Sequence, residues 1–307
     1  MTGRIDVHQH LWPGPLIALL LRRLRPPFLR EEGDGWTLSI TGEPRWPVIP
    51  ADHDPALRAA LVRADGLDAA VVALSSPLGI EALPAHEARP LIDAYHEGVR
   101  DLPRGLRAWA SAGLASPDPR DLARRLDEGF VGLCLPAGGL LGPEEADRCS
   151  TLLAVLEERG APLFVHPGPA PRTAPRLIAP GLPAWWPALT AYVAQMQAAW
   201  LGFLEWVRPV HPELRVCFAM LAGLAPLHAE RLASRGREVP LADPLAFYDT
   251  SSYGSRAIAA MRAAVGEEAL VYGSDRPVVP APEGHDDIDP SRVANPARLF
   301  ALQEVHA

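Results

Sequence analysis

The sequence predicts an α/β fold, specifically a (β/α)8 TIM barrel formed by a single domain over residues 1–307, with a small N-terminal hairpin insertion. Two observations carry this prediction. Short apolar runs alternate along the chain with segments of helical periodicity, which is the pattern of parallel βαβ units. Eight such units fit into 307 residues, which is the size of one barrel. A doubly wound open sheet is the main alternative.

The predicted strands are continuous apolar runs, as expected for a parallel sheet that is covered on both faces. We expect them at residues 5–10, 69–74, 106–112, 130–135, 162–166, 214–219, 246–250 and 269–275. Helical patterns occupy residues 15–25, 54–65, 84–102, 118–128, 142–159, 184–207, 224–235, 255–265 and 291–305. Residues 33–50 have the pattern of a small hairpin.

Local signals mark several helix ends. Asp54 and Asp118 each precede a proline and combine an N-cap carboxylate with a first-turn proline. Gly66 and Gly160 end helices, because glycine adopts the left-handed conformation without strain. The Pro-rich stretch 167–183 is interpreted as a long active-site loop and not as a linker between domains.

Composition excludes several classes of function. A formal net charge of -8 argues against nucleic-acid binding. No apolar run approaches the roughly 20 residues of a membrane-spanning helix, and no signal-peptide pattern precedes His8. We therefore expect a cytoplasmic protein with a small-molecule substrate. All 29 residues counted as Lys plus Arg are arginine, which excludes a Schiff-base lysine, a P-loop and a carbamylated-lysine metal bridge.

Four residues are candidate metal ligands. His8 and His10 project to the same side of an extended strand, so both imidazoles can share one cation. His166 ends the fifth predicted strand and Asp275 the eighth, and the carboxyl ends of barrel strands meet at one face. Three imidazoles and one carboxylate suit one divalent metal per chain, with Zn favoured and Mn, Fe or Co as alternatives.

Three motifs resemble the amidohydrolase superfamily: the His-x-His of the first strand, Leu-Phe-Val-His-Pro-Gly around His166, and Tyr-Gly-Ser-Asp-Arg-Pro around Asp275. The resemblance covers residue 4 to about residue 300. It points to the amidohydrolase-related group that contains aminocarboxymuconate-semialdehyde decarboxylase, resorcylate-type decarboxylases and dicarboxylate lactonases. It implies a mononuclear site with His8, His10, His166 and Asp275 as ligands, although some lactonase-type relatives work without metal.

One position departs from that group. The decarboxylases end the sixth strand in a catalytic histidine, whereas this chain has Met220, which cannot transfer a proton. His228, eight positions later, is the nearest candidate to replace it. The sequence therefore favours hydrolysis of an amide, ester or lactone by metal-activated water, with Asp275 and His228 as catalytic residues. A non-oxidative decarboxylase of a small aromatic or unsaturated carboxylic acid is the alternative, and a barrel that only binds a ligand is the third hypothesis.

Aromatic and polar residues near the predicted barrel mouth are candidates for substrate binding. Two of them, the adjacent Trp185 and Trp186, fit a lid or the interface of a homodimer equally well. An arginine can hold a carboxylate, although Arg276 can instead orient its neighbour Asp275. Asp249 is expected in a hydrogen-bonded loop, and the remaining histidines, His53 among them, are interpreted as surface or structural. The substrate-binding candidates are Trp12, Arg172, Trp185, Trp186, Tyr253 and Arg276.

Overall fold

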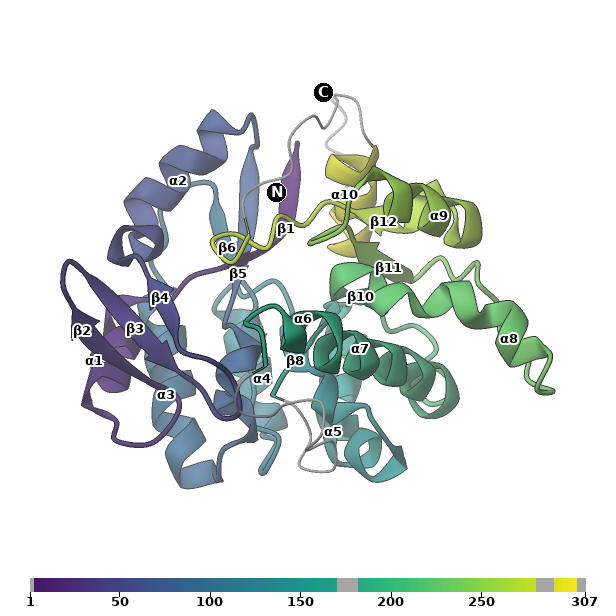
Figure 1. Cartoon of the computed structure of the whole chain (residues 1–307). Coiled ribbons are helices and arrows are strands. Elements are labelled where there is room, and N and C mark those ends of the chain that lie inside the picture. The colour runs from purple at the N-terminus through teal and green to yellow at the C-terminus, as the bar shows by residue number, and fades with distance from the viewer. Residues whose placement is uncertain (1–2, 170–181, 280–289, 303–307) are drawn as a thin grey trace.

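The core of the computed structural model consists of two parallel β-sheets (Figure 1). The structure describes residues 3–169, 182–279 and 290–302. One sheet has the order β1 (Ile5–His10), β5 (Ala69–Ala73) and β6 (Leu106–Ala108). The other has six strands in the order β12-β11-β10-β9-β8-β7. These are β7 (Ala110–Ser111), β8 (Leu133–Pro136), β9 (Leu163–His166), β10 (Val216–Phe218), β11 (Ala246–Asp249) and β12 (Leu270–Val271).

The two sheets adjoin at both of their edges. Trp109 separates β6 from β7, and its backbone N–H donates to Val72 O at 2.9 Å. At the other edge β1 runs beside the segment that follows β12: His10 N donates to Arg276 O at 2.7 Å, and Asp275 N donates to His8 O at 2.9 Å. These bonds place the chain on either side of Asp275 against the carboxyl end of β1.

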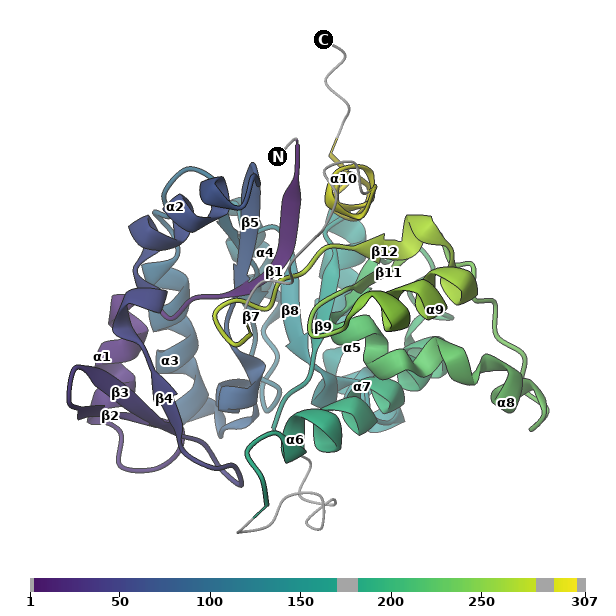
Figure 2. The same ribbon diagram turned by 45° about the horizontal axis from the view of Figure 1, so that its top comes forward.

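Helices lie outside the strands on all sides of the core (Figure 2). Every residue of β1, β5, β8, β9, β10 and β11 is buried, as the apolar strand pattern predicts for a sheet that is covered on both faces. No helix within the described residues combines the length and the apolar character needed to cross a bilayer. The helices are α1 (Gly14–Arg22), α2 (Pro55–Ala64), α3 (Ala85–Gly98), α4 (Pro119–Asp127), α5 (Pro143–Arg159), α6 (Trp186–Leu189), α7 (Ala191–Gly202), α8 (Ala229–Ala233), α9 (Ser255–Val265) and α10 (Ala294–Leu299).

An antiparallel sheet lies beside α1 in Figure 1 and is formed by β2 (Phe28–Glu32), β3 (Gly35–Ser39) and β4 (Trp46–Val48). Where the sequence predicts a hairpin over 33–50, this sheet has three strands and begins at Phe28. The predicted N-caps of α2 and α4 are present: Asp54 Oδ1 accepts from Ala56 N at 2.7 Å, and Asp118 Oδ1 accepts from Arg120 N at 3.0 Å.

The helix predicted over 224–235 is present in a shorter form, as a 3-10 segment over 225–228 followed by α8 (Ala229–Ala233). Before it, residues 220–224 form a left-handed turn after β10, with φ between 45° and 64°. Four of its five residues are not glycine, and a left-handed L-residue costs roughly 1–2 kcal/mol, so the turn stores about 4–8 kcal/mol. Burial of Leu221 and Ala222 offsets this, together with a 2.9 Å hydrogen bond from Gln197 Nε2 to Gly223 O.

Candidate metal centre

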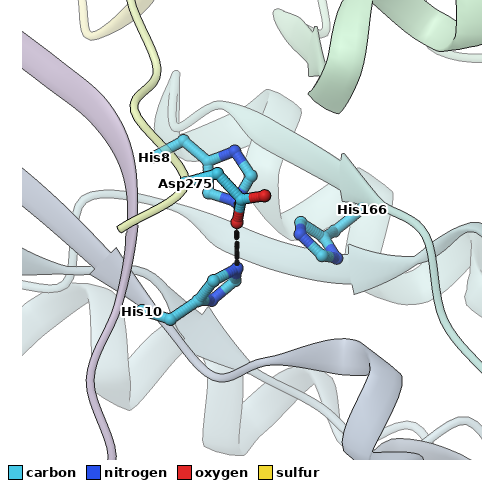
Figure 3. A group of neighbouring side chains, drawn as sticks. All are labelled: His8, His10, His166 and Asp275. Carbon is cyan, nitrogen blue, oxygen red and sulfur yellow. Dashed lines mark hydrogen bonds and ion pairs between the residues drawn. The ribbon is translucent and has the colours of Figure 1, made fainter. Parts of the chain in front are cut away.

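Four side chains from three parts of the fold converge at the carboxyl ends of the strands (Figure 3). β1 supplies His8 and His10, β9 ends at His166, and Asp275 follows β12. One ligand atom from each side chain lies within 4.8 Å of all the others. The Nε2 atoms of His8 and His10 are 3.0 Å apart, and Asp275 Oδ1 is 3.1 Å from His10 Nε2. The sequence-predicted ligand set is therefore brought together.

The hydrogen bonds of the three imidazoles orient the same nitrogen of each ring towards this point. The Nδ1–H groups donate outward: His8 to Asp249 Oδ2 at 2.8 Å, His10 to Ala73 O at 3.3 Å, and His166 to Pro167 O at 2.7 Å. In the neutral ring this leaves Nε2 with a free lone pair. Two such lone pairs 3.0 Å apart repel each other unless a cation or a proton lies between them. The donor set therefore fits a divalent metal.

The pKa shifts of these four side chains also fit a group that binds a divalent cation. Burial lowers the pKa of His8, but the charge and hydrogen bond of Asp249 and the charges of Asp275 and Asp6 together raise it, to about 9. Burial lowers the pKa values of His10 and His166, which keeps these rings neutral. Burial raises the pKa of Asp275, but the hydrogen bond to His10 and the charge on His8 lower it to about 2. Asp275 is therefore ionised, and its side chain, 14% exposed, is the most open of the four.

Asp249 is a residue whose role the sequence did not reveal. It ends β11 and is fully buried. Oδ2 accepts the Nδ1–H of His8, and Oδ1 accepts the backbone N–H groups of Met220 at 3.1 Å and Ser251 at 2.8 Å. Asp249 therefore orients a ligand and also holds the backbone at the start of the left-handed turn. Its place at the end of a strand, like that of Asp275 after β12, is the sequence feature that could have revealed this role.

A buried acid also lies near the strand ends. Glu81 Oε1 accepts hydrogen bonds from Ser76, which follows β5, at 2.9 Å and from Ser111, which ends β7, at 3.3 Å. Its other oxygen has no partner among the described residues. Burial raises the pKa of Glu81 to about 7. No sequence pattern marks this residue, because its surroundings arise only from the tertiary fold.

A second group of possible ligand atoms, formed by Asp93, His96 and Asp121, does not fit a metal. Ser111 N–H donates to His96 Nε2 at 3.0 Å, so the neutral ring carries its proton on the other nitrogen and offers no free lone pair. Arg125 lies 3.2 Å from Asp93 and 3.4 Å from Asp121, so a guanidinium already neutralises both carboxylates.

The other predicted site residues lie in several environments. Trp12 is buried, and its indole N–H donates to Ser75 Oγ at 3.0 Å. Trp185 is 56% exposed and contacts the ring of Trp186 at the start of α6. Tyr253 is half-buried, packed against the hydrophobic core after β11.

Arg276 and His228 are not part of the metal-ligand group, and Arg172 cannot be placed. Arg276 makes an ion pair with Asp65 at 3.0 Å, so its guanidinium is already engaged by a carboxylate. His228 is exposed, its Nε2 is 3.5 Å from Gln197 Nε2, and it is not part of the metal-ligand group. Arg172 lies outside the described residues.

No protein-family model matches this sequence, and no curated protein matches it significantly. Solved structures do match. Isoorotate decarboxylase (IDCase) from Metarhizium anisopliae aligns with a TM-score of 0.74 at 18% identity, over 92% of this chain and 86% of that chain. 5-Carboxyvanillate decarboxylase from Sphingomonas paucimobilis aligns with a TM-score of 0.74 at 15% identity, over 99% and 100%. A structure described as amidohydrolase II aligns with a TM-score of 0.73 at 18% identity, over 97% and 99%.

The chain shares its fold with these solved structures. In this chain the fold consists of parallel strands surrounded by helices (Figure 2). A further match with this fold, 5-carboxyvanillate decarboxylase from Novosphingobium aromaticivorans, has manganese and 4-hydroxy-3-methoxy-5-nitrobenzoic acid bound; it aligns with a TM-score of 0.72 at 17% identity, over 98% and 97% of the two chains. At these identities the likeness establishes the fold alone.

Proposed function

We propose that this protein is a divalent-metal-dependent, non-oxidative decarboxylase of a small aromatic or unsaturated carboxylic acid. One observation carries the proposal: three imidazoles, each with its Nδ1–H bonded elsewhere, turn their Nε2 atoms to one point beside the carboxylate of Asp275. The structural neighbours support decarboxylation over the hydrolysis that the sequence favoured, because they are mainly decarboxylases of aromatic acids, several with manganese bound.

We also propose that the two parallel sheets close into one (β/α)8 barrel that forms a single domain. The backbone hydrogen bonds between β1 and residues 272–276 support this, as does the continuity of the chain through Trp109 between β6 and β7. In such a barrel the carboxyl ends of the strands form the catalytic face, which is where the metal-ligand group lies. The cytoplasmic location and the homodimer stay predictions.

The chemistry of the proposed reaction divides between the metal and Asp275. When bound, the cation would stabilise negative charge on the carboxylate and a neighbouring oxygen of the acid. Asp275 is ionised, and its Oδ2 accepts a hydrogen bond from Ser252 Oγ at 3.3 Å. The substrate enters as its carboxylate, and as this second negative charge binds beside Asp275, Oδ2 takes up one proton from solvent. The bond to the carboxyl group then breaks, its electron pair stays on the substrate carbon, and the proton passes from Asp275 to that carbon as CO2 leaves.

This route removes the reason for favouring hydrolysis. The sequence lacks a histidine at position 220, and that absence took away the expected proton donor. In the structure Met220 is half-buried, and its backbone N–H is held by Asp249 and Ser251. Because Asp275 can both accept and return the proton, decarboxylation needs no acid at position 220.

The test is CO2 release by the metal-loaded protein. The chain is loaded separately with Mn²⁺ and Zn²⁺ and incubated with 5-carboxyvanillate, 2,6-dihydroxybenzoate and isoorotate, each carrying ¹³C in its carboxyl group. Release of labelled CO2 in step with loss of the acid is the expected result. Ester, amide or lactone hydrolysis without CO2 release from any acid would instead restore the hydrolase hypothesis. Asp275→Asn is the matched variant, and it should abolish CO2 release because an amide cannot carry the proton.

A further inference from the structure

A second histidine-containing cluster lies beside the metal centre. His53 ends the 3-10 turn before α2, and only 5% of it is exposed. Trp12 N–H donates to its Nδ1 at 3.1 Å, and its imidazole stacks on the Trp12 indole with ring centroids 4.3 Å apart at 12°. The indole is itself fixed by its hydrogen bond to Ser75. The His53 ring is therefore held both at its edge and on its face.

These contacts set the protonation of the ring. Because Nδ1 accepts a hydrogen bond, the neutral imidazole carries its proton on Nε2. Burial lowers the pKa of His53, and the charge of Arg58 lowers it further, to about 3. His53 is therefore neutral at physiological pH and presents one N–H donor. In the described parts of the chain this Nε2 has no hydrogen-bond partner, and it retains solvent-accessible surface.

The two segments that hold His53 are the same segments that hold a metal ligand. Trp12 follows His10 by two residues. Ser75 follows Ala73 by two residues, and the carbonyl of Ala73 accepts the Nδ1–H of His10. His53 is thus held through segments that follow β1 and β5, the same two strands that supply and orient His10. A neutral donor beside a cation can bind an anionic oxygen without adding a charge that competes with the metal.

We propose that His53 is a substrate-binding residue whose Nε2–H donates a hydrogen bond to an acidic oxygen of the substrate, in its carboxylate or in an adjacent hydroxyl group. This proposal rests on the proposed decarboxylase function, since it places that oxygen next to the metal-ligand group. Trp12 then acts through His53: it orients the imidazole and does not itself present a face to the substrate. The role is one of binding, with no proton transferred.

Two substitutions separate binding from support of Trp12. His53→Asn places an amide oxygen near the position of Nδ1, where it can accept from Trp12 N–H, but removes the distal donor. His53→Gln places an amide N–H near the position of Nε2 but removes the acceptor for Trp12. The probes are 2-nitroresorcinol and 4-hydroxy-3-methoxy-5-nitrobenzoic acid, which are bound in two structural neighbours, titrated by absorbance against the Mn²⁺-loaded protein.

We expect His53→Asn to weaken binding of these probes by roughly tenfold to 100-fold, the effect of losing a hydrogen bond to a charged oxygen. His53→Gln should stay within about threefold of the wild type, and the manganese content should not change in either variant. Wild-type affinity in His53→Asn with weakened binding in His53→Gln would overturn the proposal and assign His53 to the support of Trp12. If the Mn²⁺-loaded wild type binds neither probe, the decarboxylase function fails first, and this proposal fails with it.

Discussion

Asp249→Asn tests the metal centre most directly, because the structure dictates how the new amide must lie. Oδ1 of Asp249 accepts two backbone N–H groups, from Met220 and Ser251, so this position must remain an oxygen. The amide nitrogen therefore replaces Oδ2, which now accepts the Nδ1–H of His8 at 2.8 Å. Two donors cannot face each other, so the proton of His8 moves to Nε2 and blocks the lone pair that points to the metal.

The expected loss of metal affinity follows from the role of residues that, like Asp249, hydrogen-bond to a metal ligand without binding the metal themselves. Removing the group that orients a metal-bound histidine typically lowers metal affinity by about 10-fold to 100-fold, which corresponds to about 1.4–2.7 kcal/mol. The assay is competition of the protein with a chromophoric chelator for Mn²⁺ and for Zn²⁺, with thermal unfolding to verify the fold. Glu81→Gln is the matched control, because it also turns a buried carboxyl into an amide but contacts no ligand.

Glu81→Gln should leave the affinity of the metal centre unchanged while Asp249→Asn lowers it. An affinity of Asp249→Asn within threefold of the wild type would refute the reasoning, since the amide would then have been accommodated without moving the proton of His8. Equal losses in both variants would indicate a general disturbance of the strand ends and would contradict the specific role of Asp249.

The remaining predictions concern stability and the ligand set. Glu81 should make the fold sensitive to pH, because burial raises its pKa from 4.5 to about 7 and so favours the protonated form. Its contribution is complete below pH 4.5 and is lost as the pH rises through 7, so the wild type should lose about 3 kcal/mol relative to Glu81→Gln between pH 4.5 and 8. Urea unfolding at both pH values measures this, and parallel pH profiles would contradict it. His166→Ala should lose bound metal, since it removes one of three imidazoles, whereas the exposed His228→Ala should keep both metal and activity. Elemental mass spectrometry measures the metal content of both variants. Metal loss in His228→Ala would show that the ligand set is incomplete.

Features that depend on nearby residues were predictable from the sequence. The N-caps at Asp54 and Asp118 form with backbone amides two and three positions away, so the sequence alone determines them. The ligands His166 and Asp275 were predictable for a related reason. Each follows an apolar strand, and parallel strands bring their carboxyl ends together without any knowledge of the side-chain contacts.

Features that depend on contacts across the fold were missed. His53 lies on a short turn, and its hydrogen bond and stacking with Trp12, which is 41 positions away, form only in the folded chain. Arg276 adjoins Asp275 in sequence, yet its side chain pairs with Asp65, which is 211 positions away. The left-handed turn over 220–224 was not predicted, because its residues, such as Leu221 and Ala222, carry no sequence signal for a positive φ.

The left-handed turn after β10 has a consequence for how this protein can change over evolution or in the laboratory. Its backbone is held by Asp249, Ser251 and Gln197, none of which contacts the side chain at position 220 through these bonds. Histidine tolerates a positive φ better than methionine does. The side chain at this position can therefore be exchanged while the scaffold stays as it is. Met220→His would install a new imidazole at the end of β10, so this one position gives a route to altered chemistry without redesign of the fold.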